Sequence, residues 1–282
     1  SYISRIGMPP SCRKRLRSEG PAVFEERAAD REHFRLGLPQ GQNVLEFLPA
    51  RSFASARLFM RGLLLAGTGG RAAAIRDRLA PDFLDEGRPL VAPRQVHGVR
   101  ILKAAPEVAL PAQVEADGIL LTRSDLDASL RFADCAPVLL LPSEEWARRH
   151  GPWALILHSG YKGTVQNIAQ SGLLEVERSI GRGAAASASA WIGPCIAGRS
   201  YPRTLEEWTQ RGLSAFHPEN VDRMGQSFHF DIAGEIRRQL MECGVPEDRV
   251  HVAGMDTASD GRCYSYRGGD REDRMFLHLR LL

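Results

Sequence analysis

The sequence has no hydrophobic run long enough to cross a membrane and no closely spaced cysteine pair. No apolar run approaches the roughly 20 residues that span a bilayer, and the first 20 residues are basic without the apolar core of a signal peptide. The five cysteines form no Cys-x-x-Cys pair, which suits a reducing compartment better than a disulfide framework. We therefore expect a soluble, cytoplasmic protein with no membrane association.

Lysine is almost absent, although the net charge is +3. It occurs only at positions 14, 103 and 162, and every other basic residue is arginine. The only dense basic cluster spans residues 13–17, whereas a nucleic-acid surface needs basic residues clustered with exposed aromatic rings. We expect no nucleic-acid partner, and we interpret the cluster as a solvated arm or a contact with a partner. Lys162 is notable because it indicates a place where a compact ammonium is preferred over a planar guanidinium.

The chain divides into an arm and a body. Residues 1–43 are rich in charge, proline and glycine without a sustained hydrophobic period, so we predict an extended N-terminal arm. We expect the arm to pack on the body or on a second copy of the chain, which would give a homo-oligomer. Residues 44–282 then form one large domain, since 282 residues with 43% hydrophobic content can bury a substantial core.

Short apolar runs and amphipathic stretches predict an α+β fold with mixed β-sheets flanked by helices. Strands are predicted at 99–103, 118–122, 129–132, 138–141, 153–157, 249–253 and 275–282, and helices at 71–84, 164–180 and 231–244. These elements do not alternate strictly between strand and helix, so a doubly wound parallel sheet is disfavoured. A glycine-rich turn at 67–70 precedes the first helix, but it lacks the spacing of a phosphate-binding loop, and we interpret it as a plain turn.

Three residues at strand borders are candidate metal ligands: His97, Cys135 and His158. Singly, a histidine in a loop or a buried cysteine is usually structural. Their separations exclude a zinc finger, whose ligands come in close pairs. Two imidazoles and a thiolate favour zinc over magnesium or calcium, and three ligands leave a position open for water or substrate.

Six ordered motifs around these residues resemble the bacterial YfiH-like proteins, also called the laccase-domain or multicopper polyphenol oxidase family, which has the purine nucleoside enzyme FAMIN as a mammalian relative. The matching segments are residues 95–98 (QVHG), 116–118 (ADG), 133–138 (ADCAPV), 158–163 (HSGYKG), 192–196 (IGPCI) and 265–267 (SYR) with 274–275 (RM). They cover about two thirds of the chain.

The resemblance implies a zinc-dependent enzyme that phosphorolyses purine nucleosides and deaminates adenosine. Zinc would be bound at His97, Cys135 and His158. Purine nucleoside and phosphate would be the small-molecule partners. For the remaining roles we predict Asp134, Asp117 and Lys162 as catalytic residues and Arg76, Gln95 and Arg267 as substrate or phosphate contacts. The two aspartates could instead orient a zinc-bound histidine.

The chain departs from the family pattern at several positions. Ser159, Tyr161 and Lys162 replace alanine, tryptophan and arginine, Gly268 replaces an arginine, and residues 63–75 preserve little of an upstream asparagine-containing segment. A degenerate, non-catalytic member is therefore one alternative.

A second alternative is a metal-independent hydrolase of the peptidoglycan-editing type. In this hypothesis Cys135 is the nucleophile and His97 or His158 is the base. A multicopper oxidase is disfavoured, because the eight histidines form no His-x-His pair.

Overall fold

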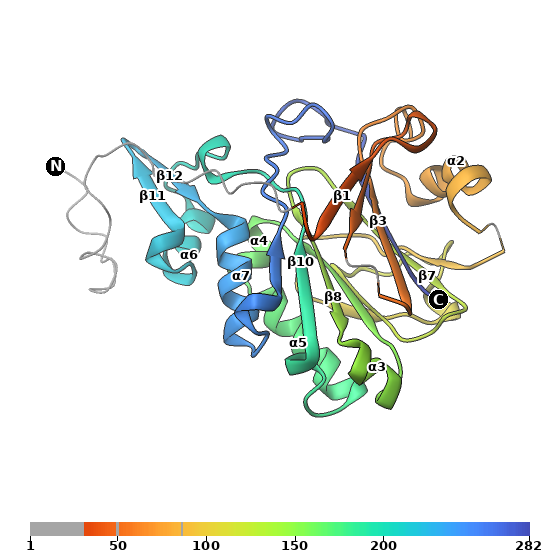
Figure 1. The fold of residues 1–282 in the computed structure, drawn as a ribbon. Coiled ribbons are helices and arrows are strands. Elements are labelled where there is room, and N and C mark those ends of the chain that lie inside the picture. Colours follow the sequence, from red (N-terminus) through yellow and green to blue (C-terminus); the bar gives the residue numbers. More distant parts are fainter. Residues whose placement is uncertain (1–30, 49–50, 86) are drawn as a thin grey trace.

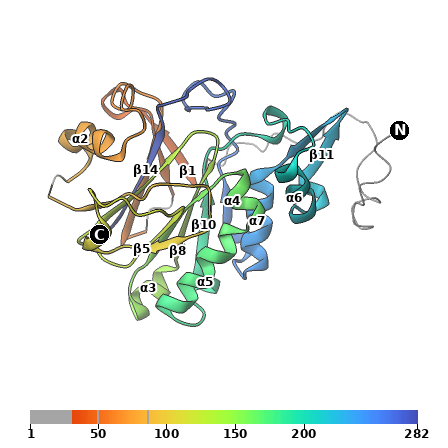
Figure 2. The same ribbon diagram turned by 180° about the vertical axis from the view of Figure 1, so that it is seen from behind.

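Two six-stranded mixed sheets pack against each other in the computed structural model, which describes residues 31–48, 51–85 and 87–282 (Figures 1 and 2). The first sheet has the strand order β1-β2-β3-β14-β7-β4, and the second has the order β13-β10-β8-β9-β6-β5. The predictions for residues 1–30, including the basic cluster at 13–17, lie outside the described residues.

The described elements alternate irregularly along the chain. The strands are β1 Phe34–Gly37, β2 Val44–Phe47, β3 Ala54–Phe59, β4 Leu90–Val91, β5 Ile101–Lys103, β6 Gly118–Leu121, β7 Asp127–Phe132, β8 Ala136–Pro142, β9 Ala154–Ser159, β10 Ala188–Ile192, β11 Val221–Met224, β12 Ser227–Phe230, β13 Val250–Val252 and β14 Met275–Leu281. The α-helices are α2 Ala72–Phe83, α3 Glu144–His150, α4 Tyr161–Val165, α5 Ile168–Ile180, α6 Glu207–Ala215 and α7 Ile232–Glu242. The α+β class with mixed sheets is confirmed.

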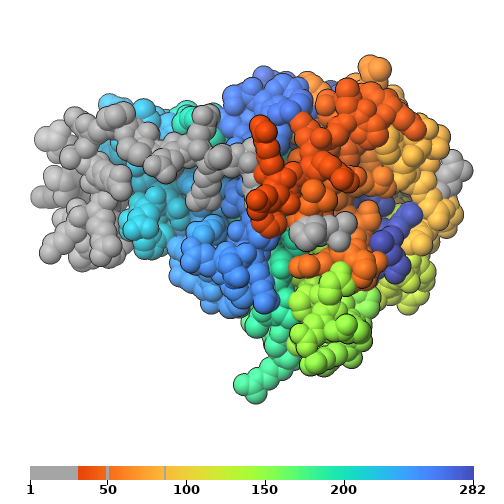
Figure 3. Space-filling model, in the orientation of Figure 1, coloured from red at the N-terminus to blue at the C-terminus, as the bar shows by residue number. Residues whose placement is uncertain are grey.

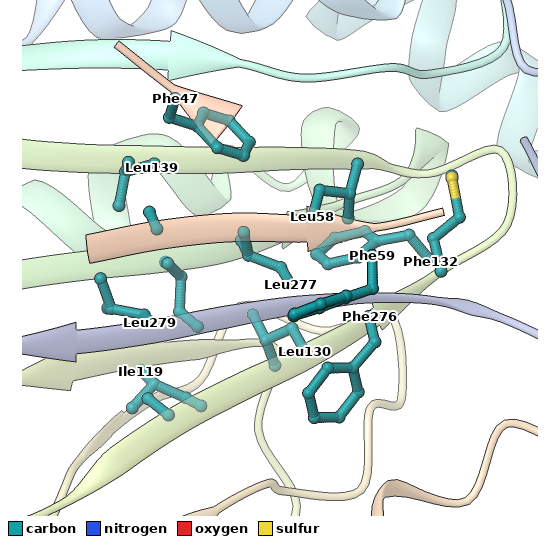
Figure 4. Packing of buried hydrophobic residues seen from close by; sticks show 14 of the residues in the cluster. Phe47, Leu58, Phe59, Ile119, Leu130, Phe132, Leu139, Phe276, Leu277 and Leu279 are labelled. Atoms are coloured by element: carbon teal, nitrogen blue, oxygen red, sulfur yellow. The ribbon is translucent and has the colours of Figure 1, made fainter. Parts of the chain in front are cut away.

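The main hydrophobic core lies between the two sheets. Leu130 and Leu277 from the first sheet share one buried cluster with Ile119 and Leu139 from the second, and all four side chains are fully buried (Figure 4). Apolar burial of this kind is the largest favourable term in folding. It fixes the position of the strand ends from which the candidate site residues extend.

Helices cover the outer faces. A second buried cluster joins the other face of the β8–β9 sheet to α5 and α7 through residues such as Leu173 and Ile236. Helix α2 lies beside the first sheet, away from the second (Figures 1 and 2). There Ile75 is fully buried, and the ring centroid of Phe83 lies 5.3 Å from that of Phe59.

Two of the predicted helices are confirmed, and the third is divided. Helices α2 and α7 match the predictions for 71–84 and 231–244, and the Asp231 side chain caps α7 by accepting a hydrogen bond from Gly234 N. The predicted helix at 164–180 is wrong at its start. Asn167 adopts a left-handed conformation and caps α5, so α4 and α5 are separate helices. Asparagine tolerates this conformation and is a favoured N-cap.

All seven predicted strands occur, within a few residues of their expected limits. The strands β1, β2, β3, β4, β10, β11 and β12 and the helices α3 and α6 were not predicted, because they are short or lack a clear period. Strand β1 pairs antiparallel with β2, so the first sheet includes residues on both sides of the predicted arm boundary at residue 43.

The first and last strands of the described chain, β1 and β14, belong to the same sheet. Strand β14 pairs antiparallel with both β3 and β7, and the blue C-terminal segments adjoin the red N-terminal ones at the surface (Figure 3). Within the described ranges, no helix combines the length and apolar character that crossing a bilayer would require.

Candidate metal centre and its cavity

The three predicted ligands come together at one end of the central strands. Cys135 lies between β7 and β8, His158 is on β9, and the β8–β9 register pairs Pro137 with His158. His97 is supplied by the loop before β5. The candidate ligand atoms of the three residues all lie within 4.8 Å of one another, and no other such group occurs among the residues that the structure describes.

Asp117 is a buried carboxylate that holds two of the candidate ligands, His97 and His158, in position. Its Oδ1 accepts hydrogen bonds from His97 N at 2.9 Å and His158 Nδ1 at 2.8 Å, and its Oδ2 accepts from Val96 N at 3.1 Å and Gly98 N at 2.8 Å. The loop wraps around the carboxylate, which stabilises the left-handed conformation of His97 (φ 61°). Asp117 is fully buried, and it does not line the cavity described below.

The donor set fits a metal ion such as zinc. Because His158 Nδ1 is bonded to Asp117, its Nε2 is left as the ligand atom, an arrangement common for metal-binding histidines. Burial alone would raise the pKa of Cys135, but His158 and His97 outweigh burial and lower it, which favours the thiolate. Gly160 leaves the sulfur its space, since a Cβ on that residue would lie 2.4 Å from Cys135 Sγ.

The centre opens into a cavity of about 720 Å³, a volume typical of small-molecule sites. Seven of the nine predicted site residues line it: Gln95, His97, Asp134, Cys135, His158, Lys162 and Arg267. Arg76 is not among the lining residues. Its guanidinium instead donates to Asp77 Oδ1 at 2.9 Å on the partly exposed surface of α2.

Asp134 joins three segments of the cavity wall. Its Oδ1 accepts from Thr257 Oγ1 at 2.8 Å, its Oδ2 accepts from Arg267 N at 2.8 Å, and its backbone oxygen accepts from Ile196 N at 2.9 Å. It adopts a left-handed conformation (φ 79°) and is buried. These contacts fix Asp134 in the cavity wall, and its catalytic role stays a prediction.

Gln95 and the two cavity cations are also fixed by their neighbours. Gln95 uses both ends of its amide on the backbone of Arg131, with two hydrogen bonds of 2.8 Å. Lys162 Nζ lies 4.8 Å from the ring centroid of Trp208, and Arg267 Cζ lies 4.6 Å from that of Tyr201. These cation–π contacts hold both charges at the cavity wall without neutralising them.

The sequence did not reveal every residue of the wall. The unpredicted lining residues include Arg131, Tyr161, Tyr201, Arg203, Tyr266 and Arg274. Tyr266 and Arg274 lie inside matched motifs, so the motifs alone could have suggested them. Arg131 and Arg203 reach the cavity only through the fold.

The glycine-rich turn at 67–70 has a structural role that the sequence did not indicate. Gly67 N and Gly69 N donate to Asp273 Oδ2 and Oδ1 at 2.9 and 3.1 Å. The turn therefore binds a carboxylate of this chain. It also connects two segments that depart from the family pattern, because residue 273 belongs to the loop that contains Gly268.

The chain belongs to the family described as multi-copper polyphenol oxidoreductase laccase, which it matches over residues 71–279. It is 29% identical over 161 residues to a purine nucleoside phosphorylase of Rickettsia conorii, covering 54% of this chain and 60% of that protein. A purine nucleoside phosphorylase of Rickettsia prowazekii is 35% identical over 162 residues, with the same shares of both chains. The chain thus spans about 60% of the length of these relatives.

Two solved structures share the fold. YlmD from Geobacillus stearothermophilus superposes with a TM-score of 0.74 at 20% identity, covering 89% of this chain and 99% of that one. A YfiH protein of Bacillus licheniformis has a TM-score of 0.72 at 20% identity, covering 88% of this chain and 99% of that one. The family description and the His-Cys-His cluster together indicate a metal-binding domain.

Proposed function

We propose that this chain is a zinc-dependent purine nucleoside phosphorylase that also deaminates adenosine at C6. The observation that carries the proposal is the position of the His97-Cys135-His158 cluster in the wall of a cavity that also contains Lys162 and Arg267. The relatives named purine nucleoside phosphorylase support the choice of substrate class.

Zinc is the metal that the ligands favour. Two imidazoles and one thiolate suit zinc, and three ligands leave one position open. When bound, zinc would supply Lewis-acid chemistry, either by polarising a substrate oxygen or by lowering the pKa of a water molecule. A multicopper centre would need more ligands than this one group, which is the only one found in the described ranges.

The protein residues supply binding and orientation. In phosphorolysis a phosphate oxygen forms a bond to C1′ of the ribose, the bond from C1′ to the purine breaks, and the departing purine takes up a proton. Lys162 and Arg267 would hold the phosphate, since each lies at the cavity wall and forms no ion pair with a carboxylate of the described chain. Asp117 fixes the orientation and tautomer of His158.

Adenosine turnover tests the proposal. With zinc-loaded protein we expect adenine and ribose 1-phosphate when phosphate is present, and inosine as the product of deamination. His158→Ala should abolish both reactions. Normal turnover by this variant, or no turnover of any purine nucleoside by the wild-type protein, would refute the proposed function.

A cysteine hydrolase is the second candidate, and one observation favours it. Asp117, His158 and Cys135 form a chain of interactions like that of an Asp-His-Cys triad. Asp117 bonds His158 Nδ1, and burial, which alone would lower the pKa of His158, is outweighed by Cys135 and Asp117, which raise it.

Metal analysis of untagged protein separates the two candidates. One zinc per chain, lost in Cys135→Ser and His97→Ala, supports the phosphorylase. A protein without bound metal that is acylated at Cys135 by an ester substrate supports the hydrolase.

A further inference from the structure

Arg131 is a cavity-lining arginine that neither the family motifs nor the proposed phosphate contacts include. It is the second-last residue of β7, and Cys135 lies four residues further along the chain. Its Nη2 donates to Pro93 O at 2.6 Å, whereas its Nη1 is buried and has no hydrogen-bond partner. A buried guanidinium nitrogen without an acceptor is costly, and among the buried polar side-chain atoms that lack a partner in the described ranges this is the one whose residue lines the cavity.

The charge of Arg131 is not neutralised by the protein around it. No carboxylate of residues 31–48, 51–85 or 87–282 forms an ion pair with it. Burial lowers its pKa to about 10, and the only opposing influence is Asp117. Asp117 already accepts four hydrogen bonds from other groups, which leaves it little capacity to serve as a counter-ion. At neutral pH Arg131 is therefore a cation in need of an anion.

The local structure holds Arg131 in place for such a role. The Gln95 side-chain amide donates to Arg131 O and accepts from Arg131 N, with both hydrogen bonds at 2.8 Å. The hydrogen bond from Arg131 Nη2 to Pro93 O fixes the guanidinium. Binding groups that are fixed before the ligand arrives lose less entropy on binding. This arrangement also explains why the Gln95 amide is not available to contact a substrate directly.

Three other polar groups at or beside the cavity, apart from Lys162 and Arg267, already have anionic partners. Arg94 pairs with Glu115, and Arg203 pairs with Glu206 and also donates to Tyr201 Oη at 2.6 Å. The amides of the glycine-rich turn bind Asp273. Arg131 differs from these groups because it is both fixed and without an anionic partner among the described residues.

We propose that Arg131 is a binding residue for a phosphate group in this cavity. Phosphate matches the guanidinium because it offers several acceptor oxygens and negative charge. The inference rests on the proposed function in one respect, since phosphorolysis supplies inorganic phosphate as a ligand. The same chemistry would recognise the phosphate of a nucleoside monophosphate, and the experiment distinguishes these two sources.

Equilibrium binding measures the effect without any turnover. Isothermal titration calorimetry at constant ionic strength would compare wild-type protein with Arg131→Met and Arg131→Lys. The matched control is Arg94→Met, because Arg94 lines the same cavity but already pairs with Glu115. The ligands are inorganic phosphate, AMP and adenosine, each titrated alone.

Arg131→Met should weaken phosphate binding by about 10- to 100-fold, as expected for loss of a charge-assisted hydrogen bond. Arg131→Lys should retain part of the affinity, Arg94→Met should bind like the wild type, and adenosine affinity should not change. Weaker binding of inorganic phosphate identifies free phosphate as a ligand, and weaker binding of AMP alone identifies a phosphate monoester. Both results support the inference.

If Arg131→Met bound both inorganic phosphate and AMP with wild-type affinity, the inference would be overturned. The same holds if the wild-type protein bound neither of these two ligands. A thermal melt without ligand checks the fold, and Arg131→Lys provides the comparison if Arg131→Met unfolds. The proposed function is tested separately. If adenosine is phosphorolysed with an unchanged KM for phosphate in Arg131→Met, only the inference fails. If no nucleoside is turned over but Arg131→Met loses phosphate affinity, only the proposed function fails.

Discussion

Replacing Asp117 with asparagine should damage both the fold and the metal centre. Each carboxylate oxygen of Asp117 accepts two hydrogen bonds, one pair from His97 N and His158 Nδ1 and the other from Val96 N and Gly98 N. Asparagine has only one oxygen, so in either orientation its amide NH₂ group faces two donors. The change keeps the shape of the side chain and removes its accepting capacity.

The magnitude follows from these contacts. Each buried donor left without an acceptor costs about 1–3 kcal/mol. Two such donors predict a loss of about 2–6 kcal/mol in the free energy of unfolding of the metal-free protein. His158 also loses the partner that orients it, which typically weakens metal binding by about 10- to 100-fold.

Urea denaturation and zinc competition with a chromogenic chelator measure the two effects. Asp125→Asn is the matched control, because Asp125 is exposed and pairs only with Arg123 at the surface, and this variant should show no measurable change in either assay. Asp117→Asn with wild-type stability and a zinc affinity within about twofold of the wild type would refute the reasoning.

Three further predictions follow from local geometry. Burial alone would raise the pKa of Asp127, but Arg280 and His278 outweigh it and lower the pKa to about 2. Its roughly 2 kcal/mol of stability should therefore be present above pH 4 and lost as the pH falls from about 4 to about 2; an unchanged acid transition in Asp127→Asn, measured by circular dichroism, would contradict this. Gly160→Ala should reduce zinc content, because its Cβ would collide with Cys135 Sγ, whereas Gly261→Ala, where a Cβ meets nothing within 4 Å, should leave the zinc measured by mass spectrometry unchanged. On α5, Leu173→Ala should lower the free energy of unfolding by about 2–5 kcal/mol, and Leu174→Ala, whose side chain is 62% exposed rather than 2%, should have little effect in the same urea titration; equal losses would argue against the packing described for α5.

The sequence predicted the elements with strong patterns and missed those formed mainly by tertiary packing. Helix α7 was predictable because Asp231 is a strong N-cap before a regular apolar period. Strands such as β1 and β4 were not, since four and two residues are too few to show a period. The break before α5 was missed because the apolar period continues through Asn167, and only its left-handed backbone interrupts the helix.

The site was predictable where chemistry is tied to motifs. The segments that hold His97, Cys135 and His158 are recognisable in the sequence, and the fold brings them together. Arg131 and Arg203 were not predictable, because no motif contains them: strand β7 brings Arg131 to the cavity, and the segment before α6 brings Arg203. The position of Arg76 was equally inaccessible, since its pairing with Asp77 depends on side-chain geometry at the surface of α2.

The hydrogen bonds between the turn at 67–70 and Asp273 have a consequence for protein engineering. The turn supplies two backbone N–H donors, from Gly67 and Gly69, and the Asp273 carboxylate accepts both hydrogen bonds. A chimaera that takes only one of these segments from a relative would leave either the amides or the carboxylate without partners. The two segments therefore form a single exchangeable module of the cavity wall, although about 200 residues separate them in the sequence, and transplants between family members should carry them together.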